Sequence, residues 1–129
     1  DRIDVYQLHV PDPAVSYDAS METLAKLREQ GKIRHVGLSN VTQEHVERGR
    51  KIVPIVSVQN RYSFADREWD YLVHYCEQHD IAFMPWAPLG QNRKALEVLE
   101  RIAQELGATT LQVGLAWLLK RSKIMLPIP

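Results

Sequence analysis

The sequence has one cysteine, no excess of charge and no long apolar stretch. Cys76 has no partner for an internal disulfide, which favours a reducing, cytoplasmic setting. The 16 basic residues balance 16 acidic ones, so no electrostatic attraction to nucleic acid or an anionic membrane is expected. No apolar run approaches the roughly 20 residues that span a bilayer. No charged-then-apolar leader precedes Asp1, so we expect no secretion signal.

The histidines do not have the spacing of a metal site. His74 and His79 would point to different faces of a helix, and no cysteine or carboxylate completes a set with His35 or His45. We therefore predict no bound metal.

Short apolar runs alternate with helix-like segments along the whole chain. This alternation predicts an α/β fold in which parallel strands are joined by right-handed helical crossovers. We expect five strands, within residues 5–8, 36–38, 56–58, 82–86 and 124–127. We expect five helices: 16–30 with a Ser16 cap and Gly31 stop, one from Thr42 to before Pro54, one from Asp66, 93–106 with Gly107 as its stop, and 111–121 opened by Thr110.

The later helices carry apolar residues at helical spacing. The fifth helix is apolar on most sides, so it is expected to be well buried. The inward-facing residues of the third and fourth helices are predicted to be Trp69, Leu72, Val73, Cys76, Leu96, Leu99, Ile102, Ala103 and Leu106.

Two architectures fit this pattern, an open doubly wound sheet and part of a (β/α) barrel. The residues after the first strand, His9 to Pro13, contain no glycine-rich phosphate fingerprint, which disfavours a dinucleotide-binding open sheet. A full barrel takes about 250 residues. We therefore predict a parallel (β/α) half-barrel, with residues 1–129 as a single unit.

Polar side chains follow several of the predicted strands. His9, Ser39, Asn40 and Gln59 come where strands end, and the carboxyl ends of parallel strands are where active sites form. Plainer roles exist for these residues. His9 could be satisfied by backbone, and Ser39 or Asn40 could cap the next helix. Trp86 could be a core filler rather than a stacking surface.

Five segments, taken together and in order, resemble the aldo-keto reductase family. The stretch from Gly31 to Asn40, GKIRHVGLSN, resembles the fifth-strand signature of that family. The other four segments are residues 6–12 (YQLHVPD), 58–63 (VQNRYS), 85–90 (PWAPLG) and 111–117 continuing through 126–129. The resemblance covers essentially the whole chain and implies the second half of a TIM barrel.

The resemblance implies a role for each matching residue. The family places its catalytic histidine at His9, where the imidazole orients and polarises the substrate carbonyl. Ser39, Asn40 and Gln59 would hold the nicotinamide carboxamide, and Trp86 would stack on the nicotinamide ring. Pro88, Leu89 and Gly90 would form a turn near the cofactor diphosphate. The implied cofactor is NADP(H), with NAD(H) as the alternative, and the implied substrate is a small aldehyde or ketone.

Two departures from the family pattern limit this expectation. Val41 stands where the family usually has an aromatic residue. The aspartate, proton-donating tyrosine and lysine of the family have no counterparts in this chain. We therefore expect the chain alone to be inactive, and to self-associate or pair with a complementary half-barrel through open sheet edges. The rival hypothesis is a non-catalytic half-barrel that acts as an interaction or regulatory module.

Overall fold

The computed structural model of the protein describes residues 1–90 and 92–128, and the chain divides into two compact units. The first unit comprises residues 1–59, and the second unit comprises residues 60–129. The described residues form four strands and five helices. Pro129, the last residue of the segments that resemble the reductase family, lies outside the described residues.

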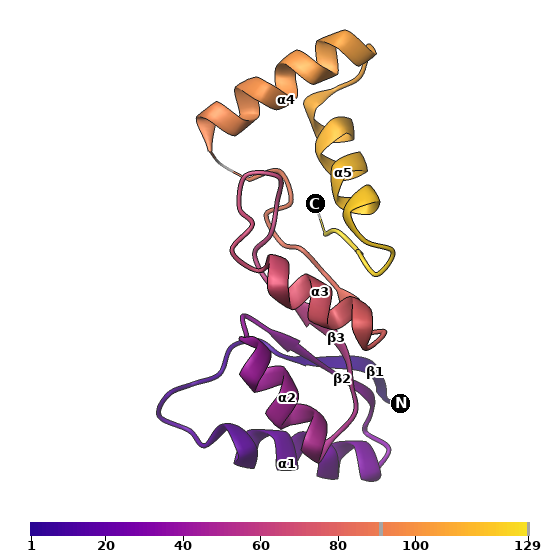
Figure 1. Ribbon diagram of the computed structural model, residues 1–129. Coiled ribbons are helices and arrows are strands. Elements are labelled where there is room, and N and C mark those ends of the chain that lie inside the picture. Colours follow the sequence, from indigo (N-terminus) through magenta and orange to yellow (C-terminus); the bar gives the residue numbers. More distant parts are fainter. Residues whose placement is uncertain (91, 129) are drawn as a thin grey trace. The chain divides into compact units, whose positions relative to one another are not determined.

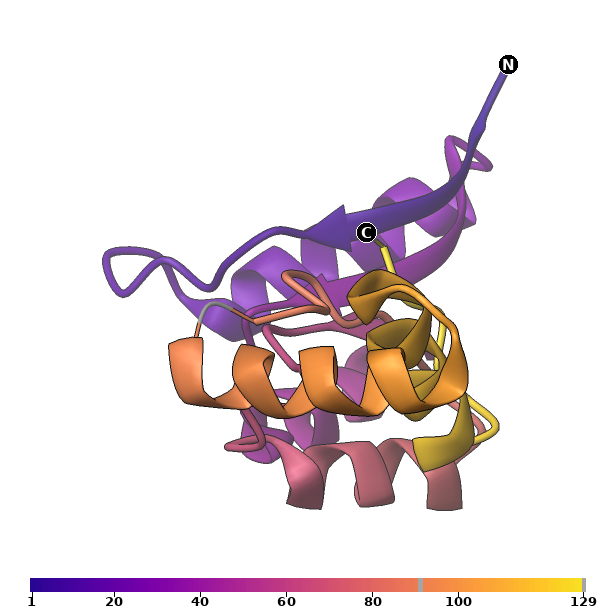
Figure 2. The ribbon, with the colours of Figure 1, turned by 90° about the horizontal axis from the view of Figure 1, so that it is seen from above.

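The first unit is a parallel three-stranded sheet with two crossover helices. Its elements are β1 (Ile3–Leu8), α1 (Tyr17–Glu29), β2 (Ile33–Ser39), α2 (Gln43–Ile52) and β3 (Ile55–Gln59). The strands are paired in chain order, with Leu8 opposite Leu38 and Ser39 opposite Gln59. Figure 2 shows β1, in indigo, along the edge of this sheet.

Local chemistry sets the ends of both crossover helices. Ser16 caps α1, its Oγ accepting a hydrogen bond from the Ala19 backbone N–H at 3.3 Å, and Gly31 follows α1 with φ +72°. Thr42 caps α2 in a capping box with His45. The predicted bounds of these two helices are therefore confirmed to within one residue.

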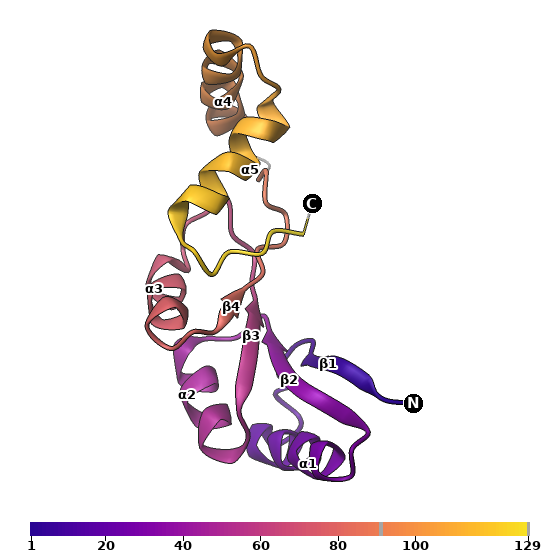
Figure 3. The same cartoon turned by 90° about the vertical axis from the view of Figure 1, so that its right-hand side faces the viewer.

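The two faces of this sheet differ in chemistry. Helices α1 and α2 lie on the same face of the sheet (Figures 1 and 3). Val36, Leu38 and Val58, in β2 and β3, are fully buried. On the opposite face the Gln7 side chain donates a hydrogen bond to Ser57 Oγ at 3.4 Å, passing over Gly37. A Cβ atom at Gly37 would lie 2.4 Å from Ser57 Oγ, so glycine is required there by the close approach.

The helix layer of the first unit contains a buried tyrosine. The Tyr17 hydroxyl donates a hydrogen bond to the His45 carbonyl at 2.7 Å. Burial raises the pKa of Tyr17 to about 12, although the nearby Arg48 guanidinium acts in the opposite direction. Tyr17 therefore stays a neutral core residue that ties the start of α1 to α2.

The second unit is mainly helical. Its elements are α3 (Asp70–Gln78), β4 (Ala82–Phe83), α4 (Arg93–Leu106) and α5 (Thr110–Arg121). Residues 124–128 run beside residues 83–85 and are joined to them by three backbone hydrogen bonds of 2.8–3.2 Å. Gly107 ends α4 with φ +61°, as predicted, and Thr109 caps α5.

Two predicted strands are shorter than expected, and one predicted helix start was wrong. The strand expected over 82–86 stops at Phe83 and the one expected over 124–127 is reduced to a bridge at Met125, because Pro85 and Pro127 have no N–H to continue a ladder. The third helix starts at Asp70 rather than Asp66. Asp66 instead forms a tight turn, with mutual backbone hydrogen bonds to Ser63.

The apolar faces of the later helices were predicted in part. Leu72, Val73 and Cys76 are buried on α3, as are Leu99 and Ala103 on α4. Leu106 was expected inside but is 68 % exposed, because it lies in the last turn of α4 just before the chain reverses at Gly107.

The fifth helix is less buried than its composition predicted. Only Gly114 and Leu118, four residues apart on one stripe, are buried on α5, while Leu111 and Leu119 are exposed. Among the described residues no helix is long and apolar enough to cross a membrane.

Candidate functional site

The carboxyl ends of β1, β2 and β3 lie at one edge of the first-unit sheet. His9 directly follows β1, Ser39 ends β2 and Gln59 ends β3. Because the strands are parallel, with Leu8 opposite Leu38 and Ser39 opposite Gln59, these residues and Asn40 meet at this edge. The structure therefore brings together the four first-unit residues singled out in the sequence.

Asn40 connects the three strand ends. Its side-chain Nδ2 donates one hydrogen bond to the His9 carbonyl at 3.0 Å and another to Ser39 Oγ at 3.1 Å. Its backbone N–H donates to the Gln59 carbonyl at 3.0 Å, and Ser39 Oγ donates to the same carbonyl at 2.9 Å. Asn40 has φ +53°, a left-handed conformation that asparagine tolerates better than most residues.

The capping role considered for Ser39 and Asn40 belongs to a different residue. Thr42, not either of them, caps α2, its Oγ1 accepting from the His45 N–H at 3.4 Å. Ser39 is 2 % exposed and its hydroxyl proton is directed to the Gln59 carbonyl. Asn40 is exposed and carries an amide oxygen that can accept two hydrogen bonds.

His9 and Gln59 present side chains at the same edge. The backbone carbonyl of His9 accepts a hydrogen bond from Asn40. His9 itself is exposed and lies just beyond the end of β1. Gln59 is half-buried, and its backbone carbonyl accepts from both Ser39 and Asn40. The His9 imidazole and the Gln59 amide together offer both donors and acceptors to a polar ligand. The Ser39 hydroxyl and the N–H groups of the Asn40 amide are engaged within the network.

The second unit places Trp86 beside Arg61. The two residues form a parallel bridge, with the Trp86 N–H donating to the Asn60 carbonyl at 3.1 Å. The guanidinium carbon of Arg61 lies 5.7 Å from the Trp86 ring centroid, within cation–π range. Arg61 Nε also pairs with Asp66 Oδ2 at 2.9 Å. Nothing in the sequence signals this contact, because Arg61 and Trp86 are far apart along the chain.

Residues 87–90 form a tight turn after Trp86. The Gly90 N–H donates to the Ala87 carbonyl at 2.9 Å, and Ala87 and Gly90 have φ +50° and +67°. A Cβ at Gly90 would lie 2.7 Å from Ser63 Oγ, so close packing requires glycine there. Pro88 is buried. Leu89 packs against α5 at Gly114, where an added Cβ would lie 3.0 Å from a methyl carbon of Leu89.

A network around Asp70 supports this part of the second unit. Asp70 accepts hydrogen bonds from the Tyr62 hydroxyl, from Arg67 at 2.6 Å and from Arg121 at 3.1 Å. Burial alone would raise the pKa of the Asp70 carboxyl, but these three donors together lower it below its usual value. Burial and the bond to Asp70 raise the pKa of Tyr62. Sequence reasoning missed this network, which includes residues from three separate segments.

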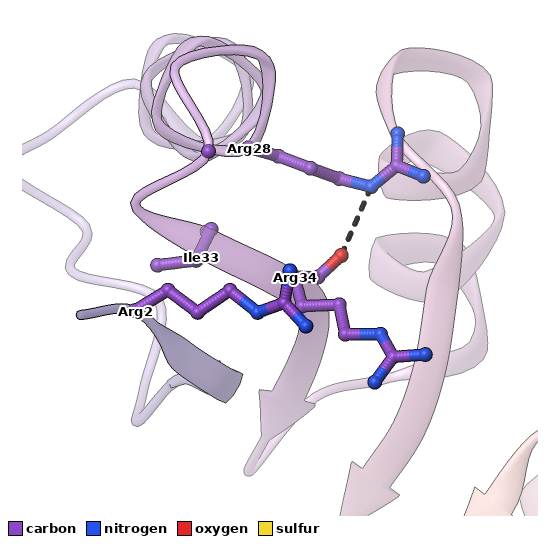
Figure 4. Close-up of a pocket in the computed structure, with 5 residues that line it drawn as sticks. Arg2, Arg28, Ile33 and Arg34 are labelled. Carbon is purple, nitrogen blue, oxygen red and sulfur yellow. Dashed lines mark hydrogen bonds between the residues drawn. The ribbon is translucent and has the colours of Figure 1, made fainter.

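A hollow of about 330 Å³ lies at the opposite end of the first-unit sheet from His9 and Ser39. Figure 4 shows Arg2, Arg28 and Arg34 around it, with Ile33 at the start of β2. Arg28 Nε donates to the Arg34 carbonyl at 3.2 Å, and Arg2 and Arg34 each lie 3.9 Å from Asp4. Within residues 1–90 and 92–128, no cluster of His, Cys, Asp and Glu could hold a metal ion.

Comparison with known proteins identifies the class of protein. The chain belongs to the aldo/keto reductase family, a family of oxidoreductases whose sequence model matches residues 1–129. The chain is 44 % identical over its full length to pyridoxine 4-dehydrogenase of Escherichia coli, of which it covers 48 %. It is 41 % identical over 99 % of its length to an uncharacterized oxidoreductase of Schizosaccharomyces pombe, of which it covers 42 %.

Solved structures agree with this assignment. A thermostable aldo-keto reductase in complex with the inhibitor epalrestat matches the whole chain with a TM-score of 0.90 and 31 % identity, and the chain covers 49 % of it. An aldo/keto reductase from Klebsiella pneumoniae in complex with NADP and acetate matches with a TM-score of 0.84 and 29 % identity, with 48 % covered. The predicted α/β class, corresponding to half of an aldo-keto reductase barrel, is confirmed. The chain spans about half the length of the relatives it matches.

Proposed function

We propose that this chain forms the second half of a reductase that converts aldehydes or ketones to alcohols with NADP(H). The observation that carries the proposal is the Asn40 network, which fixes His9, Ser39 and Gln59 at one sheet edge. These are the positions at which the chain resembles the catalytic and cofactor-binding residues of its family. Only the side chains of Ser39 and Asn40 take part in this network, so the side chains of His9 and Gln59 are not needed to hold the strand ends together.

The residues present fit a nicotinamide cofactor. A carboxamide has one acceptor and two donors, and the side chain of Gln59 includes both kinds of group. Binding through Ser39 and Asn40 would replace hydrogen bonds that these two residues make within the network. Trp86 offers a flat aromatic face in the second unit, and the backbone of the turn from Pro88 through Leu89 to Gly90 is proposed to lie near the diphosphate. NADP(H) is preferred over NAD(H) because the Klebsiella pneumoniae relatives were solved in complex with NADP or NADPH.

His9 is the proposed catalytic residue. Reduction of a carbonyl adds a hydride to carbon and a proton to oxygen, and the bound reduced nicotinamide would supply the hydride. The His9 imidazole would donate a hydrogen bond to the carbonyl oxygen, which orients the substrate and stabilises the developing negative charge. We propose that the proton comes from a tyrosine outside this chain, as the family resemblance implies.

The chain alone is proposed to be inactive and prone to association. Within the described residues β1 is paired on one side only, and Val5 and Tyr6 on it are 45 % and 42 % exposed. An open strand edge with apolar side chains favours pairing with another copy or with a complementary half-barrel. The buried thiol of Cys76 is compatible with the cytoplasmic setting that we propose.

The test requires a complete barrel. We would replace the matching segment of Escherichia coli pyridoxine 4-dehydrogenase with this chain, and call the product the chimera. We expect the chimera to bind NADPH and to reduce members of a panel of aldehydes and ketones, measured by loss of cofactor absorbance. The isolated chain should show no turnover.

Two variants of the chimera separate catalysis from folding. His9→Leu removes the proposed hydrogen-bond donor and should lower kcat by about 10²- to 10³-fold with little change in the Kd for NADPH. His74→Leu, an exposed histidine on α3, is the matched control and should leave kcat unchanged. Unchanged turnover in His9→Leu, or full turnover by the isolated chain, would contradict the proposal.

A further inference from the structure

The Arg61 guanidinium lies over the Trp86 ring, and the Asp66 carboxylate forms an ion pair with that guanidinium. The guanidinium carbon is 5.7 Å from the ring centroid, and Asp66 accepts from Arg61 Nε at 2.9 Å. The Arg61 backbone forms a bridge with Trp86. Asp66, the ion-pair partner of Arg61, lies in a tight turn in which the backbones of Ser63 and Asp66 exchange hydrogen bonds and Ser63 Oγ also accepts from the Asp66 N–H. The Arg61 guanidinium therefore has two partners, the Trp86 ring and the Asp66 carboxylate, while 43 % of the Arg61 side chain is exposed.

We propose that Arg61 and Asp66 set the preference of this protein for the reduced over the oxidised cofactor, acting through the Trp86 ring. This inference rests on the proposed function, in which the nicotinamide stacks on Trp86. Arg61 would be a specificity-determining residue that lowers affinity for the oxidised form, and Asp66 would moderate its effect.

The argument follows from the charge of the two cofactor forms. The oxidised nicotinamide ring carries a positive charge, whereas the reduced ring is neutral. An aromatic face attracts cations through its quadrupole, so a tryptophan alone would favour the oxidised ring. Because Arg61 already uses that attraction and adds a positive charge nearby, the oxidised ring is repelled and the neutral ring is not.

Asp66 determines how strong this repulsion is. Its carboxylate lies 2.9 Å from Arg61 Nε and offsets part of the guanidinium charge that the cofactor would experience. Removing the positive charge of Arg61 and removing the negative charge of Asp66 should therefore change cofactor preference in opposite directions. A purely structural role for the pair would affect both cofactor forms alike.

The experiment compares Kd values for NADP⁺ and NADPH in the chimera by isothermal titration calorimetry at low ionic strength. Arg61→Gln should lower the ratio of the NADP⁺ Kd to the NADPH Kd by about two- to fivefold, the size of an exposed cation–π interaction. Asp66→Asn, which preserves the shape of the side chain, should raise the same ratio. Arg101→Gln removes an equal charge from an exposed position on α4 and should leave the ratio unchanged.

The ratio of the NADP⁺ Kd to the NADPH Kd tests this inference separately from the proposed function. Taking both Kd values on one variant cancels any general loss of binding caused by local distortion. A ratio that stays constant, or that moves in the same direction in Arg61→Gln and Asp66→Asn, would overturn the inference while the chimera still binds NADPH. Failure of the unaltered chimera to bind either cofactor would instead overturn the proposed function, and the inference with it.

Discussion

Asn40 should contribute to stability in two separable ways, through its side-chain hydrogen bonds and through its left-handed backbone. Asn40→Ala removes the bonds to the His9 carbonyl and Ser39 Oγ, and each is worth about 0.5–1.5 kcal/mol net. It also places an alanine at φ +53°, which costs about 1–2 kcal/mol. The sum is a loss of about 2–5 kcal/mol.

Asn40→Gly removes the same two hydrogen bonds but adopts the left-handed conformation without strain. Its expected cost is about 1–3 kcal/mol, so the two variants should differ by about 1–2 kcal/mol. The free-energy loss per hydrogen bond is expected at the lower end of its range. His9 is exposed, so water can replace the Asn40 amide at the His9 carbonyl.

Urea unfolding of the chimera, followed by circular dichroism, measures both values. The slope of the transition should be unchanged, so that midpoint shifts report stability alone. Equal losses for Asn40→Gly and Asn40→Ala would show that the backbone conformation contributes nothing. Losses below about 0.5 kcal/mol for both variants would refute the idea that Asn40 holds the strand ends together.

Three further predictions concern the core and the turns. Gly90→Ala should destabilise the chimera by more than Gly107→Ala, because both glycines have positive φ but only Gly90 has an atom within 3 Å of the added Cβ; equal midpoints in urea would count against this. Between pH 10 and about 12 the free energy of unfolding should fall by about 2–3 kcal/mol because folded Tyr17 keeps its proton, and Tyr17→Phe should flatten this dependence. Gly37→Ala should cost about 1–3 kcal/mol, and combining it with Ser57→Ala should recover part of that loss in thermal unfolding; strict additivity would argue against the predicted clash.

The sequence was sufficient where a local signal determined the structure. Ser16, Thr42 and Gly107 each end or begin a helix through their own backbone or side-chain chemistry, so the helix bounds could be predicted from residue type. The order of parallel strands and helices followed from apolar patterning, and it placed His9 and Asn40 at strand ends correctly.

The sequence was insufficient where contacts between distant segments decided the outcome. Asp66 and Asp70 are both plausible helix starts, and packing selects Asp70 by joining it to Tyr62 and Arg121. Leu106 has the right spacing for a buried residue but lies where the helix ends. The contact between the Arg61 guanidinium and Trp86 depends on tertiary pairing that no local pattern encodes.

The Gly37 position also bears on how relatives of this protein can diverge. Gln7 fills the space over Gly37 and bonds to Ser57, so three residues on three neighbouring strands share one volume. A larger residue at position 37 requires room from both neighbours, because an added Cβ would lie 2.4 Å from Ser57 Oγ and 2.8 Å from Gln7 Cγ. Substitutions here are therefore expected to accumulate in a fixed order, and the three positions should vary together among descendants of a common ancestor.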